Sequence, residues 1–190
     1  MDKSSYKYFI MDTDQKLLKM SIKLVKLFDK IADDSLPQQI VDVVKLHSKL
    51  ALGSALIPVP GADMAACAAS IWGMYARINN KIGLPFGENV MKSIASGVAT
   101  NLASGLAMAG VASALKFIPG IGSVGGAVIM SASMYGLTLT SGYVYLKALC
   151  ALSEKKQDIN IGNITDAVND VMKNKSEVKE FMNEAKKSYK

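Results

Sequence analysis

The stretch from Ser93 to Tyr145 constrains the fold of this chain more than any other part. Lys116 is its only charged residue, and small or apolar residues dominate the arms on either side, 93–115 and 123–145. As a helix, each arm is long enough to cross the roughly 30 Å hydrocarbon layer of a bilayer. The Pro119-Gly120 turn between the arms predicts that they fold back on each other as an antiparallel hairpin. The first hypothesis is therefore contact with a membrane.

Small side chains recur along one face of the first arm at four-residue steps that begin at Ser93. Residues four apart lie on the same side of a helix, and small side chains there let a second helix approach closely. Glycine in a helix interior costs about 1 kcal/mol relative to alanine, so close packing explains its abundance better than helix propensity does. The residues predicted to pack helices tightly are Gly97, Gly105, Ala109, Gly122 and Gly126.

Hydrophobic residues make up 50% of the 190 residues and are concentrated in the middle of the chain. A chain of this length can bury a sizeable core within one structural domain. The pattern predicts an all-α helical bundle in three parts. Residues 1–50 form amphipathic N-terminal helices, residues 51–150 form a hydrophobic, glycine-rich core, and residues 151–190 form a polar helical tail.

The net charge of +6 favours an acidic partner. Nucleic-acid modules usually combine arginine with exposed aromatic side chains, whereas Arg77 is the only arginine here. An anionic membrane surface is therefore favoured over nucleic acid.

The first helix is expected to begin after Thr13 as its cap and to end near Asp33, with residues up to Met11 as a loose arm. Lysines at helical spacing line one face of it. They indicate either a surface that lies on an anionic membrane or the solvated outer face of a bundle. These lysines are Lys16, Lys19, Lys23, Lys26 and Lys30.

Further helices are expected from Ser35 to Gly53, from Asp63 to Gly83, and in an amphipathic pair near the C-terminus, 164–173 and 177–189. Pro60-Gly61 and Pro119-Gly120 stand in similar local sequences, which is consistent either with an internal repeat or with chance similarity. Each would join two helices, so the sequence predicts two Pro-Gly-linked helical hairpins packed together.

Residue types that carry chemistry are sparse. His47 is the lone histidine and is expected to be structural or on the surface instead of catalytic. Cys67 and Cys150 have neither metal-ligand spacing nor a nearby His or Cys, so both are expected to be small buried residues. No GxxxxGK[ST] phosphate loop is present. We therefore expect no enzyme activity, no cofactor and no metal. The N-terminal residues lack the pattern of a signal peptide, which predicts a cytoplasmic protein.

The segments from Ile57 to Asp63 and from Phe117 to Ser123 resemble those of a known family. They are similar to the hydrophobic helical domain of unknown function in YcjF-type bacterial membrane proteins, which also occurs at the C-terminus of Era-like GTPases. A weaker similarity reaches EcsC-type proteins and the helical domains of immunity-related GTPases. The resemblance spans about residues 50–149. It implies a bacterial, inner-membrane-associated module that works beside a separate GTPase, and it transfers no catalytic residue.

Three functions remain open from the sequence. The first is a membrane-associated helical module that docks on or remodels membrane with lipid, a GTPase or a second copy of itself as partner. The second is a soluble bundle that buries its hydrophobic hairpin and acts as a pore-forming effector, toxin or immunity protein. The third is a carrier of an apolar ligand.

Overall fold

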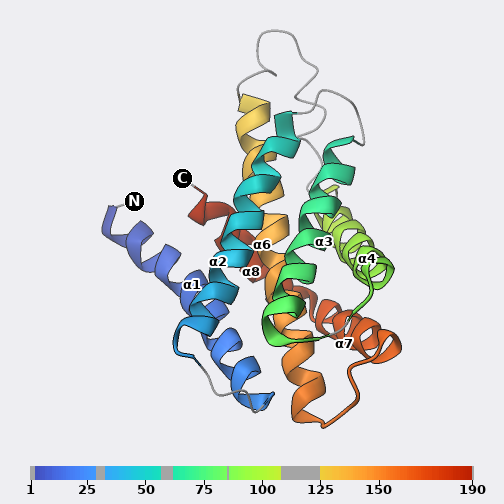
Figure 1. The fold of residues 1–190 in the computed structure, drawn as a ribbon. Coiled ribbons are helices and arrows are strands. Elements are labelled where there is room, and N and C mark those ends of the chain that lie inside the picture. Colours follow the sequence, from blue (N-terminus) through green and yellow to red (C-terminus); the bar gives the residue numbers. More distant parts are fainter. Residues whose placement is uncertain (1–2, 29–32, 57–61, 85, 108–124, 190) are drawn as a thin grey trace.

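The computed structural model describes residues 3–28, 33–56, 62–84, 86–107 and 125–189. Within these ranges the chain forms α-helices and one 3-10 helix and has no β-strand, so the predicted all-α bundle is confirmed (Figure 1). The elements are α1 (Lys3–Leu27), α2 (Ser35–Leu50), η1 (Ala51–Leu56), α3 (Ala62–Ile82), α4 (Glu88–Ala107), α6 (Gly125–Glu154), α7 (Ile161–Lys173) and α8 (Lys175–Ser188).

Helix α6 is the centre of the bundle. It contacts α1, α2, η1, α3, α4, α7 and α8. Every residue from Met134 to Leu146 is buried. A helix that is apolar on all sides must be covered on all sides, and the second arm of the hydrophobic stretch satisfies this requirement inside the protein.

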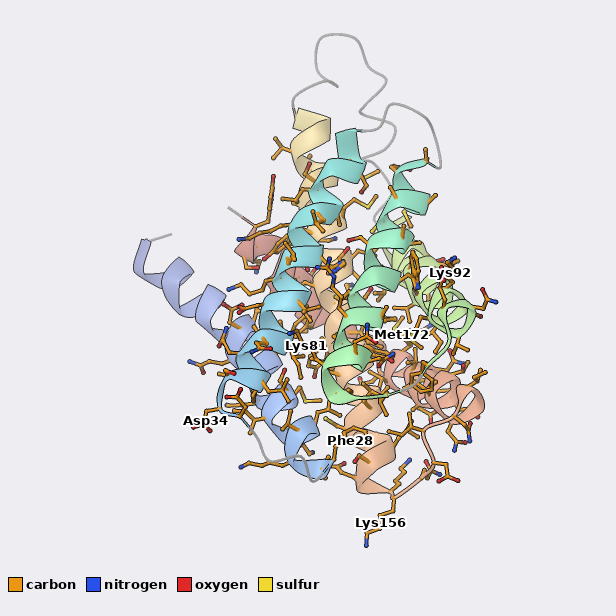
Figure 2. All side chains as sticks on the ribbon, in the orientation of Figure 1. Phe28, Asp34, Lys81, Lys92, Lys156 and Met172 are labelled. Atoms are coloured by element: carbon orange, nitrogen blue, oxygen red, sulfur yellow. The ribbon has the colours of Figure 1, made fainter. Side chains whose placement is uncertain are left out.

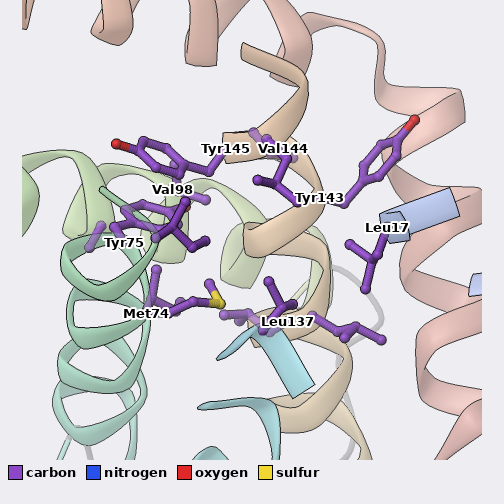
Figure 3. Close-up of a cluster of buried hydrophobic side chains, with 14 of the residues drawn as sticks. Leu17, Met74, Tyr75, Val98, Leu137, Tyr143, Val144 and Tyr145 are labelled. Carbon is purple, nitrogen blue, oxygen red and sulfur yellow. The ribbon is translucent and has the colours of Figure 1, made fainter. Parts of the chain in front are cut away.

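Aromatic residues of α6 point to opposite sides of the helix (Figure 3). Tyr145 stacks on Tyr75 of α3 with ring centroids 4.0 Å apart, and Tyr143 stacks on Phe181 of α8 at 4.3 Å. Stacked aromatic pairs add to the stabilisation that burial alone provides. The core therefore lies around α6, with α3 on one side and α8 on another.

Two glycines of α6 mark where neighbouring helices come closest. A Cβ atom added at Gly142 would lie 2.6 Å from Cγ1 of Val44 on α2. A Cβ atom added at Gly136 would lie 2.7 Å from Cγ of Lys186 on α8 and 3.3 Å from its backbone nitrogen. These positions leave no room for a side chain, so glycine permits the close approach of two helices on different sides of α6.

The C-terminal helices α7 and α8 run across the back of α6 (Figure 1). The Glu177 carboxylate on α8 accepts hydrogen bonds from the Tyr143 hydroxyl and the Lys147 ammonium, both on α6. At the other end of α8, Glu184 pairs with Lys16 of α1 at 3.0 Å. The polar tail predicted at 151–190 therefore packs on the core as a covering layer.

Several predicted helix limits are confirmed. Helix α2 begins at Ser35, Asp63 lies in the first turn of α3, and α3 ends one residue before Gly83, whose φ of 72° is the left-handed conformation that glycine favours. The prediction for the first helix was wrong at both ends. It begins at Lys3 and ends at Leu27, and Thr13 lies within it as a buried residue instead of capping it.

Candidate functional site

Helix α4 packs its bulky face against the core and leaves the neighbouring small-residue face, predicted to allow close helix approach, exposed. Its bulky residues Ile94, Val98 and Leu102 are buried, whereas the small residues Ser93 and Gly97 are exposed. Apart from the glycine itself, its chain neighbours and the adjacent backbone of α4, no atom of the described residues lies within 4 Å of a Cβ atom placed on Gly97. The described residues thus show no helix packed closely on Gly97, and its predicted role in close packing stays a prediction. Burying a branched apolar side chain gains about 1.5–3 kcal/mol, which decides which face turns inward.

For the other residues predicted to pack helices or form turns, the structure gives the backbone alone, or the residues lie outside the described ranges. Gly105 and Gly126 lie in the helical backbones of α4 and α6. Their role in close packing stays a prediction. The remaining predicted residues lie outside the described ranges. They are Ala109, Gly122 and the two Pro-Gly turns, Pro60-Gly61 and Pro119-Gly120.

The lysine face of α1 is partly engaged with the protein itself. Lys16 pairs with Glu184, and Lys23 pairs with Glu154 at the end of α6. Lys19 and Lys26 are exposed, and Lys30 lies outside the described residues. Exposed ion pairs contribute little to stability, so the lysine face of α1 adds little to the stability of the fold. The structure assigns the lysines Lys16 and Lys23 to ion pairs between helices.

The end of α2 and the start of α6 lie at the same end of the bundle (Figure 1). Four large apolar side chains on these two segments are exposed, and the other two in the described part of the chain, Ile22 and Ile161, lie on α1 and α7. We call the set of four the apolar end and define it by Leu46 and Leu50 of α2 and Val128 and Ile129 of α6. Between 44% and 57% of the surface of each side chain is accessible to water. Isolated exposed apolar residues are normal, but a concentration at one place indicates a contact surface.

The opposite end of the bundle is charged. Asp33 and Asp34 precede α2 there, and Glu154, Lys155 and Lys156 lie where α6 ends. Figure 2 shows Asp34 and Lys156 in this region, with the Lys156 side chain pointing away from the bundle. The apolar end also carries the exposed Lys49, but its exposed apolar side chains make it the end that contact with a nonpolar phase would favour.

None of the helices described for this chain is both long enough and apolar enough to cross a membrane. The sequence-based expectation that an arm of the hydrophobic stretch could span a bilayer is not met by α4 or α6. In α6 the apolar side chains contact the surrounding helices instead.

Two buried tyrosines of the core form hydrogen bonds between helices. The Tyr145 hydroxyl donates to Oδ1 of Asn79 at 2.8 Å, and the Tyr75 hydroxyl donates to the backbone oxygen of Ser141 at 3.1 Å. Burial raises the pKa values of both Tyr145 and Tyr75 well above the usual range for tyrosine. Both phenols therefore stay neutral, as a structural hydrogen-bond donor requires.

The two cysteines are buried free thiols, which confirms that they behave as small core residues. Burial raises the pKa of the Cys150 thiol to about 12, and burial also raises the pKa of Cys67, whose sulfur lies 3.5 Å from the Thr138 hydroxyl. A neutral buried thiol is a poor nucleophile. Among the residues described, no group of three or more His, Cys, Asp or Glu could hold a metal ion.

Comparison with known proteins gives one informative similarity. Over 117 residues the chain is 29% identical to "Magnetosome membrane protein 22" of Magnetospirillum gryphiswaldense. The matched region covers 60% of this chain and 60% of that relative, so neither protein is matched over its full length. No family model matches the chain, and no solved structure matches it. The relationship to YcjF-type proteins and Era-like GTPases stays a prediction.

Proposed function

We propose that this chain is a non-enzymatic helical module that docks on a membrane through its apolar end. The observation that carries the proposal is the exposure of Leu46, Leu50, Val128 and Ile129 at one end of a bundle whose other end is charged. Inserting such side chains among lipid tails removes their apolar surface from water. The bundle itself would stay outside the hydrocarbon layer, because α6 is enclosed by the other helices.

Two features of the chain support a membrane as the partner. In sequence, the segments 57–61 and 108–124, which follow η1 and precede α6, contain a single charged residue, Lys116. The net charge of +6, with Lys49 exposed next to Leu50, suits the anionic cytoplasmic face of a bacterial inner membrane. The relative with 29% identity is itself named as a membrane protein. A separate GTPase as partner is a further part of the proposal and rests on the sequence resemblance alone.

The proposal is tested by flotation with vesicles that contain phosphatidylglycerol. We expect the protein to float with them, and the double variant Leu50→Gln/Ile129→Gln to bind about tenfold more weakly. Full burial of such a side chain gains about 1.5–3 kcal/mol, and about half of that is at stake for each of the two half-exposed residues, so the lower end of the combined loss corresponds to about tenfold. The matched control is Ile161→Gln, because Ile161 is equally exposed, at 57%, but lies at the start of α7.

Two results would contradict docking through the apolar end. One is failure of the unaltered protein to float, and the other is an equal loss of binding in the control variant. The same vesicles, loaded with a self-quenching dye, separate docking from insertion. Docking at the surface leaves the dye enclosed.

Release of the dye would instead favour a second candidate, a bundle that inserts and forms pores. The enclosure of the apolar α6 by helices from both ends of the chain is the specific observation in its favour. Such a protein would have to separate α8 from α6 before α6 could meet lipid. The Glu177 contacts to Tyr143 and Lys147 would then have to break.

A further inference from the structure

His47 occupies an unusual place on α2, one turn before that helix ends at the apolar end. Its side chain is buried, with 5% of its surface exposed. The ring lies against the backbone of α3 at Gly73, where an added Cβ atom would be 2.9 Å from Cε1 of the ring. Glycine at position 73 therefore leaves the space that the imidazole fills between the two helices.

Neither ring nitrogen of His47 has a hydrogen-bond partner among the described residues. The backbone oxygen of His47, by contrast, accepts hydrogen bonds from the Ser70 hydroxyl of α3 at 2.9 Å and from the backbone N–H of Ala51. A neutral imidazole already leaves one buried N–H donor unpaired in this position, and a protonated ring would leave two donors and a positive charge. The packing thus accepts the neutral ring far better than the charged one.

The charged groups near this contact give an imidazolium no compensation. Burial first, and then the positive charge of Arg77 on α3, lower the pKa of His47 below its usual value near 6.5. Helix α2 also packs against η1, α6 and α1. No charged residue occurs in η1 or in the part of α6 that faces α2, and Asp14 of α1 is already paired with Lys45 at 2.8 Å. Asp63 lies in the first turn of α3, more than two turns away from Gly73 along the helix.

We propose that His47 is an acid-sensitive contact whose protonation loosens the C-terminal half of α2 from α3, next to the apolar end. This contact would respond to acid whether or not the apolar end meets a membrane. Because α2 carries Leu46 and Leu50 on the same turns, loosening it would change how these two side chains are presented.

The direction of the pH effect follows from linkage. The unfolded chain binds a proton on His47 near pH 6.5, and the folded chain binds it only at lower pH, so the unfolded state holds more protons between these values. Stability contributed by the neutral ring is therefore present at pH 7, declines as the pH falls through 6.5, and is lost below the pKa of the folded state.

The experiment exploits the fact that the chain contains one histidine. No other side chain with an ordinary pKa titrates between pH 7.0 and 5.5. We expect the urea midpoint of the unaltered protein to fall by roughly 0.5 M over this range, as a shifted histidine and a typical denaturant slope imply. The variant His47→Gln, whose side chain stays neutral, should show the same midpoint at both pH values. An unchanged midpoint in the unaltered protein, or an equal fall in the variant, would overturn the proposal.

A second measurement needs no variant. The single ring Cε1 proton of His47 can be followed by NMR as the pH is lowered, together with the exchange protection of α2 amides. A titration midpoint below 6.5, accompanied by a loss of protection in residues 44–50 with the same midpoint, supports the acid-sensitive contact. A midpoint at or above 6.5, or protection in α2 that does not follow the ring, contradicts it.

Discussion

Replacing Leu137 by alanine should lower the free energy of unfolding by about 2–5 kcal/mol. Leu137 lies in the middle of α6 and has no exposed surface. Its removal leaves a cavity between helices that are already in contact, and the loss adds to that of the transferred apolar surface. Since whole domains are stable by only about 5–15 kcal/mol, this loss would be a large fraction of the total stability.

Urea denaturation followed by circular dichroism measures this effect, with Val128→Ala as the control on the same helix. Val128 is 55% exposed in the first turn of α6, and its truncation should change stability by no more than about 0.5 kcal/mol. If both variants lost similar, small amounts of stability, α6 would not be the enclosed centre of the bundle.

Replacing Gly142 by alanine should destabilise the protein by about 1–3 kcal/mol. The added methyl group would lie 2.6 Å from Cγ1 of Val44 and 3.3 Å from the sulfur of Met74. A branched valine has few rotamers with which to move aside, so the strain falls on the contact between α6 and α2. A single methyl group thus acts on two helix contacts at once.

Gly97→Ala is the matched control, and its effect should have the opposite sign. Gly97 lies in α4 with open space around it, so alanine should raise stability by up to about 1 kcal/mol through helix propensity. The same denaturation assay compares the two variants. A gain at Gly142, or a loss at Gly97, would contradict the packing described for these helices.

The contrast between Gly97 and Gly142 shows how much of the helix packing could be predicted from the sequence. Four-residue spacing of small residues identified a face of α4, but spacing alone does not say which face turns inward. The bulky residues Ile94 and Val98 turned inward because their burial gains more than close approach does. The glycines that do allow close approach, Gly136 and Gly142, lie in a helix whose apolar residues run on all sides.

Helix type and several helix ends were predictable because they depend on local signals. Proline near the start of α2 and glycine after α3 act within one turn of the chain. Thr13 misled the prediction because a threonine suited to capping also fits inside a helix when tertiary contacts bury it.

The candidate site was less accessible from the sequence. Exposure of Leu50 and Ile129 depends on where α2 and α6 end relative to each other in space, and no local pattern encodes that. The place of His47 against Gly73 likewise depends on the register between α2 and α3. The sequence singled out the histidine only because it is the sole one in the chain.

The order of the helices along the chain has a consequence for synthesis on the ribosome. Helix α6 receives part of its cover from α7 and α8, which are translated after it. At about 5–20 residues per second, the 34 residues from Lys155 to Ser188, where α8 ends, take roughly 2–7 s to add. During that interval α6, the most apolar helix described, is covered only by the helices that precede it in the chain. A nascent-chain chaperone or a membrane could contact α6 before α7 and α8 do.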